Sequence, residues 1–338
     1  MPYIPVYVDP KQLRRDVRGV VLCVVAFILT MSVVSVIVFI AAVFIEYPEL
    51  VNDLINEAVR STSSTIDQTL PGYERLENAV LTVQEKYTGL ASILGMVCGL
   101  PWFFTIRGKK LLTKDITRVN SRVRPGTIAL MLVFILGVQC FMTLLQLGLE
   151  PLFNQSGNSL TDALEEGTVG LATSFWGVVY IVILGPIFEE LVFRGAVMRK
   201  LERYGANFAI VVSALLFGLY HIILFQALFA FLIGLVLAYT AGRFSLKWSI
   251  LLHMINNGLA VLTMFLGSEV FDMALNICYV LALAATVLVL FLGRRYLFAQ
   301  KVAGAPSQRN VFARAFGSPW LILYIGLCLL GGASIVMA

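Results

Sequence analysis

Apolar stretches that are each long enough to cross a lipid bilayer as a helix dominate the sequence. A helix rises about 1.5 Å per residue, so about 20 apolar residues cross the hydrocarbon core. The sequence therefore predicts an all-α fold, a polytopic transmembrane helical bundle of about eight to nine spans. The expected spans are 19–45, 89–106, 126–148, 169–190, 206–223, 226–242, 248–267, 273–293 and 318–337.

The run 206–242 is about twice as long as one span requires. We therefore divide it near Phe225 and Gln226 into a tight helical hairpin. Only 13% of the 338 residues are charged, against about 25% in soluble domains. No separate soluble domain is expected, and the net charge of +5 indicates membrane orientation rather than a nucleic-acid partner.

The loops between the expected spans alternate in charge. Lys and Arg are concentrated before the first span and in 107–124, 194–203, 243–247 and 294–314. Because Lys and Arg favour the cytoplasmic side, an integral, multi-pass protein with a cytoplasmic N-terminus is predicted. An odd number of spans would leave the C-terminus outside. The intervening loops are acidic, through residues in 46–87 and through Glu150, Asp162, Glu165, Glu166, Glu269 and Asp272.

Three of the apolar stretches carry ionisable side chains. The only two histidines, His221 and His253, lie in two of them, and the adjacent Glu189 and Glu190 lie in a third. Ionisable groups in hydrocarbon are costly, so in a membrane protein they indicate function. One buried site built from several helices is therefore expected.

The glutamates occur in the segment 185–194, which ends in Arg194. Glu190 and Arg194 are one turn apart and are expected to pair on one face. Glu189 points about 100° away, so it is free to enter a cavity, where it would serve as a general base. In the alternative interpretation, both glutamates sit at the cytoplasmic interface with Arg194.

The two histidines each have a neighbour one turn away. Phe217 precedes His221 on the same face, and His253 shares a face with Asn257. A lone histidine on an apolar helix is also compatible with a packing role. With a carboxylate, however, two imidazoles and an amide suit water activation: the imidazoles would bind a divalent metal or donate hydrogen bonds to an oxyanion.

Straight, evenly placed helices would not bring these groups to one depth. Glu189 and His253 lie near the inner ends of their expected spans. His221 lies about 16 residues into the fifth span, roughly 24 Å from the inner face. The groups meet only if 191–205 is partly embedded, with a break at Gly185–Pro186, or if the fifth helix begins below the membrane.

Glu-Glu-x-x-x-Arg at 189–194, Phe-x-x-x-His at 217–221 and His-x-x-x-Asn at 253–257 occur in this order on apolar helices. This ordered set resembles the CAAX-protease and bacteriocin-processing (CPBP) family, which includes the type II CAAX prenyl endopeptidases. The resemblance covers about 170 to 260. It implies an intramembrane metalloprotease, a hydrolase that cuts a peptide or membrane protein.

The resemblance also implies roles for individual residues. Glu189 would be the water-activating base, and Glu190 and Arg194 would support it. His221, His253 and Asn257 would bind a metal or stabilise the oxyanion. Zinc is the natural candidate for such a site, but the same residues also suit a metal-free glutamate-and-water mechanism, so a divalent metal is left open.

The resemblance suggests three segments along the chain. They are N-terminal transmembrane helices in 1–168 with an outer amphipathic helix in 46–87, a catalytic helix core in 169–267, and C-terminal transmembrane helices in 268–338. A non-catalytic membrane scaffold or bacteriocin-immunity protein remains an alternative. A secondary transporter is disfavoured, because the sequence shows no internal repeat.

Overall fold

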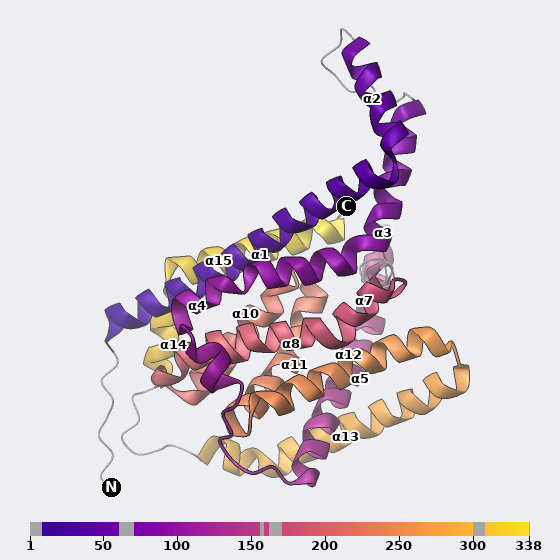
Figure 1. Cartoon of the computed structure of the whole chain (residues 1–338). Helices are drawn as coiled ribbons and strands as arrows, with labels where there is room; N and C mark the ends of the chain where they lie inside the picture. The colour runs from indigo at the N-terminus through magenta and orange to yellow at the C-terminus, as the bar shows by residue number, and fades with distance from the viewer. Residues whose placement is uncertain (1–8, 61–70, 156–158, 162–170, 300–307, 338) are drawn as a thin grey trace.

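The computed structural model describes residues 9–60, 71–155, 159–161, 171–299 and 308–337, and in these ranges the chain is almost entirely helical (Figure 1). The acidic residues predicted at 162–166 and Lys301 lie outside the described residues. The helices are α1 (Pro10–Glu46), α2 (Pro48–Arg60), α3 (Pro71–Gly99), α4 (Pro101–Arg107), η1 (Leu111–Asp115), α5 (Pro125–Gln155), α7 (Phe175–Val179), η2 (Tyr180–Leu184), α8 (Gly185–Glu190), η3 (Leu191–Met198), α9 (Arg199–Leu201), η4 (Glu202–Tyr204), α10 (Ala206–Tyr220), α11 (Leu224–Arg243), α12 (Leu246–Leu266), α13 (Glu269–Ala299), α14 (Gln308–Phe316) and α15 (Pro319–Met337).

The all-α, polytopic bundle expected from the sequence is confirmed. Among the described residues, 7 helices are long and apolar enough to cross a membrane. An eighth is formed if α14 and α15, bent by 64° against each other, count as one span. The remaining expected span, 206–223, is shorter than predicted: α10 has 15 residues, or about 22 Å of helix.

The fourth span differs most from the prediction. It was expected to end at Glu190, but it runs as one apolar unit from Phe175 to Tyr204. The segment 191–205 was assigned to a loop because of its arginines, yet Arg194 and Arg199 are buried. Consequently Glu189 lies near the middle of the span, at a depth that the short helix α10 also reaches.

The predicted hairpin is present, but it turns a few residues earlier than expected. Helix α10 ends at Tyr220 and α11 begins at Leu224. Ile222 adopts a φ of 63°, which β-branched residues rarely do. The amide N–H of Ile223 donates to the carbonyl of His221 at 2.7 Å. His221 therefore lies in the turn itself.

The basic connections meet at one end of the bundle, on the left in Figure 1. Tyr204 donates to Asp16 at 2.8 Å, and Arg118 pairs with Glu202 at 3.1 Å. The amide of Asn120 donates to the carbonyl of Phe244 at 2.7 Å. These contacts join the start of α1, the α4–α5 connection, the end of the fourth span and the α11–α12 connection, as the alternation of loop charge requires.

The acidic segment 46–87 forms α2 and the first part of α3, apart from residues 61–70, which are not described. In Figure 1, α2 projects away from the bundle beside the start of α3. Val51 of α2 and Phe39 of α1 both pack against a small apolar cluster that contains Val83 of α3. The predicted helix is therefore present, while its position on an outer membrane surface stays a prediction.

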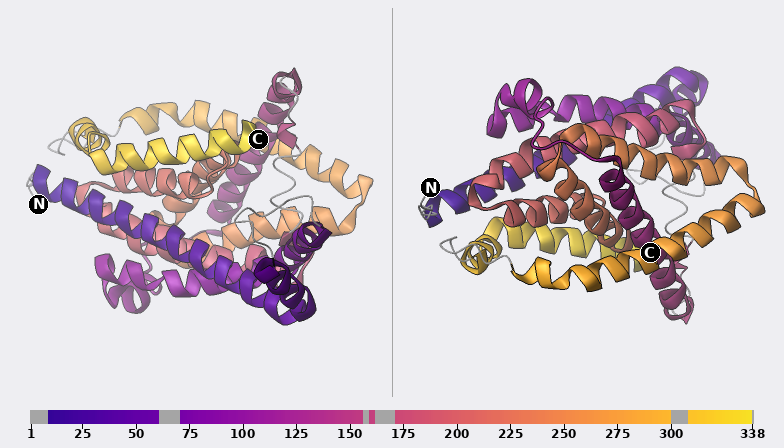
Figure 2. Two further views of the ribbon diagram at one scale, coloured as in Figure 1. Left: turned by 90° about the horizontal axis from the view of Figure 1, so that it is seen from above. Right: turned by 90° about the horizontal axis from the view of Figure 1, so that it is seen from below.

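The largest hydrophobic core joins all three predicted segments of the chain. It contains Leu13 and Phe27 from α1, Phe193 and Phe208 from the middle segment, and Leu321 from α15. The views in Figure 2 show α1 and α15 on the same side of the bundle. The division at 168 and 267 is untested by this packing and stays a prediction.

Candidate active site

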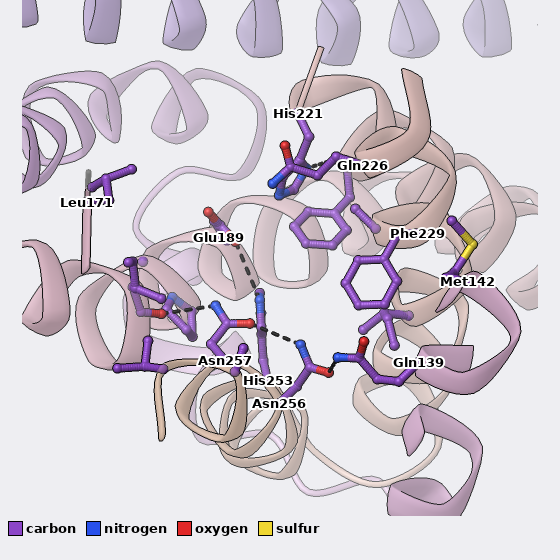
Figure 3. A pocket seen from close by; sticks show the side chains of 18 of the residues that line it. Gln139, Met142, Leu171, Glu189, His221, Gln226, Phe229, His253, Asn256 and Asn257 are labelled. Atoms are coloured by element: carbon purple, nitrogen blue, oxygen red, sulfur yellow. Dashed lines mark hydrogen bonds and ion pairs between the residues drawn. The ribbon is translucent and has the colours of Figure 1, made fainter. Parts of the chain in front are cut away.

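A cavity of about 420 Å³ opens among α5, the fourth span, α10, α11 and α12. Figure 3 shows the side chains that line it. One part of the wall is apolar, with Met142, Phe225 and Phe229, and the other carries the polar groups. Four of the six predicted site residues line it, namely Glu189, His221, His253 and Asn257. Glu190 and Arg194 lie directly behind the wall.

Glu190 is completely buried and has three partners. Arg194 Nη1 lies 2.9 Å from Glu190 Oε1, which confirms the predicted pairing one turn apart. Ser249 donates its hydroxyl to Glu190 Oε2. His253 Nδ1 lies 3.2 Å from Glu190 Oε1. Because a buried carboxylate needs such compensation, Glu190 acts as a counter-ion that fixes its neighbours.

Phe217 separates Arg194 from the cavity. The guanidinium carbon of Arg194 lies 4.3 Å from the centre of the Phe217 ring. The same ring lies nearly perpendicular to both imidazoles, with centroid distances of 5.0 Å to His221 and 5.7 Å to His253. Arg194 Nη2 also donates to the carbonyl of Gly234 at 3.2 Å. Arg194 therefore does not line the cavity.

Glu189 faces the cavity, as predicted, and is 7% exposed. Its Oε2 lies 3.6 Å from His253 Nε2 (Figure 3). Because His253 Nδ1 lies 3.2 Å from Glu190, His253 stands between the two glutamates. A carboxylate accepts hydrogen bonds, and therefore the Nδ1 that faces Glu190 carries hydrogen. Nε2, which faces Glu189, then bears a lone pair when His253 is neutral and a hydrogen when His253 is an imidazolium.

His221 is held by the helix that it terminates. Its Nδ1 lies 2.9 Å from the carbonyl oxygen of Phe217. Because a carbonyl only accepts, Nδ1 carries hydrogen there too, and Nε2 remains for the cavity. In both histidines, Nε2 therefore has a lone pair that can accept a hydrogen bond or bind a metal. A neutral histidine of this form cannot donate a hydrogen bond from Nε2 to an oxyanion.

Asn257 is anchored by a backbone carbonyl that Pro186 leaves free. In the π-helical turn η2, the N–H of Gly185 bonds to the carbonyl of Tyr180, five residues back. The next donor in this register would be residue 186, but proline has no N–H. Asn257 Nδ2 donates to the unclaimed Ile181 carbonyl at 2.9 Å. Proline thus creates an acceptor inside an apolar span.

Gly185 permits this register. A Cβ atom at Gly185 would lie 2.7 Å from the carbonyl oxygen of Tyr180, closer than real Cβ atoms come. The predicted break at Gly185–Pro186 therefore exists as a change of helical register rather than as an end of the helix.

Three polar residues of the site were missed by the sequence interpretation. Ser249 bonds to Glu190, and Asn256 donates to Asn257 Oδ1 at 3.1 Å. Gln139 of α5 donates to Asn256 Oδ1 at 3.1 Å. Helical spacing gave a signal for Ser249, since it stands one turn before His253. Gln139 was signalled only as a carboxamide within an otherwise apolar span.

The ring nitrogens of the two histidines are arranged as in metal-binding histidines, but the described side chains around them supply few further ligands. Each has Nδ1 occupied by an acceptor and Nε2 free, as metal-binding histidines do. However, within the part of the chain that the structure describes, no group of three or more His, Cys, Asp or Glu side chains is placed to hold an ion. Metal binding by His221 and His253 therefore stays a prediction.

Comparison with known proteins points to the same part of the chain. A family model described as "Type II CAAX prenyl endopeptidase Rce1-like" matches residues 171–259. No curated protein and no solved structure matches the sequence. The matched region contains all six predicted site residues, and it excludes α5 with Gln139.

Proposed function

We propose that this multi-pass membrane protein is an intramembrane endopeptidase in which Glu189 activates water. Its residues 171–259 match the model of Rce1-like type II CAAX prenyl endopeptidases. The substrate is a membrane-associated protein or peptide. The observation that carries the proposal is the line of Glu189, His253 and Glu190 at the wall of a buried cavity.

In the first step, a water molecule in the cavity donates a hydrogen bond to Glu189. Glu189 takes a proton as the water oxygen attacks the carbonyl carbon of the scissile peptide bond. The new C–O bond gives a tetrahedral intermediate with a negative oxygen. The confined apolar wall keeps other water away and strengthens the charge interactions.

The second step breaks the C–N bond. The proton taken by Glu189 passes to the leaving nitrogen, so the products are a carboxylic acid and an amine. Glu189 changes from base to acid, as a single carboxylate does in other hydrolases.

His253 and Asn257 supply hydrogen bonds to the intermediate. His253 Nε2 faces Glu189 and the cavity, and a hydrogen on this nitrogen would be donated toward the oxyanion. Asn257 Nδ2 has two hydrogens and uses one for the Ile181 carbonyl, so the other is available to the cavity.

Replacement of the proposed base tests the function. Glu189→Gln keeps the shape but removes the carboxylate, so cleavage should fall by about 10² to 10⁴-fold, the range of general-base catalysis. The assay uses purified protein in micelles with two quenched-fluorescence peptides, one with a farnesylated CAAX end and one without. Glu85→Gln, an exposed glutamate on α3, serves as the control.

Cleavage of neither peptide by the wild type, or equal cleavage by Glu189→Gln, would overturn the proposal. A biological phenotype that survives in Glu189→Gln would instead favour a non-catalytic scaffold or immunity protein. Cleavage of one peptide only identifies whether the lipid is recognised.

A further inference from the structure

Three side-chain amides form a row along one wall of the cavity (Figure 3). Gln139 of α5 donates to Asn256 of α12 at 3.1 Å. Asn256 donates to Asn257 at 3.1 Å, and Asn257 donates to the Ile181 carbonyl at 2.9 Å. The row therefore joins α5, α12 and the fourth span.

The direction of the row is fixed at its far end. The Ile181 carbonyl only accepts, so Asn257 must turn its NH₂ group toward it and its oxygen toward Asn256. Asn256 must then present NH₂ to Asn257 and oxygen to the next residue. The described residue that satisfies this oxygen is Gln139, through its NH₂ group. Amide dipoles aligned head to tail strengthen one another.

Gln139 closes the row at the other end. Among the described residues, Asn256 Oδ1 accepts from no side chain other than Gln139. Asn256 is 7% exposed, and a buried amide oxygen without a donor costs free energy. If Gln139 lost its NH₂ group, the amide of Asn256 would be more stable after a 180° rotation. Its oxygen would then face the oxygen of Asn257, and the hydrogen bond between them would be lost.

The geometry points to Gln139 as a positioning residue of the site, which holds Asn257 through Asn256 so that the second N–H of Asn257 points into the cavity. This inference rests on the proposed peptidase. Gln139 lies on α5, which is outside the region that matches the family model. The span immediately before that region would thus complete the site.

Gln139→Met tests the inference, because methionine has a similar length and no donor. We expect kcat to fall tenfold or more, in the range found for outer partners of catalytic groups, with KM within about twofold. Thr286→Val is the matched control. It removes a hydrogen bond of 3.4 Å from α13 to the Val133 carbonyl of α5. It keeps all three amides and their hydrogen bonds, so it should leave both constants unchanged.

The rate measurement separates a positioning role from a structural one. A kcat within twofold of the wild type would overturn the inference, and so would a joint loss of kcat and thermal stability below that of Thr286→Val. If Glu189→Gln is inactive while Gln139→Met is fully active, the inference fails and the peptidase stands.

A spectroscopic measurement tests whether Gln139 positions Asn257, and it does so even if the peptidase proposal fails. In protein labelled with ¹⁵N-asparagine, the side-chain NH₂ signal of Asn257 is identified by its loss in Asn257→Ala. That signal should shift in Gln139→Met and stay in place in Thr286→Val. An unchanged signal in Gln139→Met would overturn the inference.

Discussion

Arg194 carries a charge in a region where no water reaches it. Its side chain is 0% exposed, and its partners are the Glu190 carboxylate, the Gly234 carbonyl and the face of Phe217. Among the described partners of Glu190, which are Arg194, His253 and Ser249, Arg194 alone carries a permanent positive charge, because arginine stays protonated. The pair therefore controls stability as well as the field at the cavity.

Arg194→Met should destabilise the protein by about 3–5 kcal/mol, the cost of leaving a buried ion without its partner. Thermal and denaturant unfolding in micelles would measure the loss. The double variant Glu190→Gln/Arg194→Met should recover a large part of it. Arg118→Met, which breaks an exposed ion pair, should cost at most about 1 kcal/mol. Equal losses in the two single variants would contradict the argument.

A metal at His221 and His253 is open to direct measurement. The described side chains lack a group of three ligands, so the metal-free mechanism predicts that purified, active wild type carries far less than one metal ion per chain. Inductively coupled plasma mass spectrometry of wild type and His221→Ala/His253→Ala decides the point. About one zinc per chain, lost in the double variant, would make the histidines ligands and replace our mechanism.

The residues that the sequence brought forward were those whose chemistry is rare in hydrocarbon. Glu189, His221 and His253 stood out in this way, and they reach one cavity. Gln139 did not, because a single carboxamide in an apolar span has no partner visible in the sequence. Its role depends on α5 lying against α12, which is a tertiary contact.

At the scale of the helix, Pro186 determines what Asn257 can bind. Proline in a helix interior costs about 3 kcal/mol, and here the loss frees the Ile181 carbonyl. Pro186→Ala should restore a backbone donor that competes with Asn257 for this oxygen. We expect kcat to fall about tenfold, the equivalent of one hydrogen bond, with thermal stability unchanged or higher.

Pro151→Ala is the matched control, since Pro151 is also inside a helix, near the end of α5. It should leave the peptidase rate unchanged. Full activity in Pro186→Ala would show that Asn257 does not depend on the proline-freed carbonyl.

The ends of the helices were harder to predict than their existence. The fourth span was cut short because arginine is normally a sign of a loop. The structure satisfies Arg199 internally, through Glu202 and the Ala241 carbonyl at 3.0 Å. Likewise, the α10–α11 turn falls on an isoleucine with positive φ, and no glycine or proline marks it in the sequence.

At the scale of the molecule, the alternation of loop charge predicted which connections share an end, and the contacts around Tyr204, Glu202 and Asn120 agree. The same reasoning predicts that this end faces the cytoplasm. The distances between helices could not be predicted in this way, since charge patterns order the loops and leave the packing unspecified.

Cysteine labelling tests this orientation. In a background without the exposed Cys98 and Cys278, Glu269→Cys should react with an impermeant maleimide on intact cells. Lys109→Cys should react only after the cells are opened. The opposite labelling pattern would reverse the membrane orientation, and it would leave the cavity and its chemistry as described.

The spacing of Glu190 and Arg194 also bears on how the chain is made. Because the two lie one turn apart on one helix, the fourth span carries its own neutralising partner as it is synthesised. A nascent helix with an internal ion pair enters the bilayer at lower cost than one with a lone charge. Insertion of Glu190 and Arg194 into the membrane therefore depends less on earlier helices than insertion of a lone charge would.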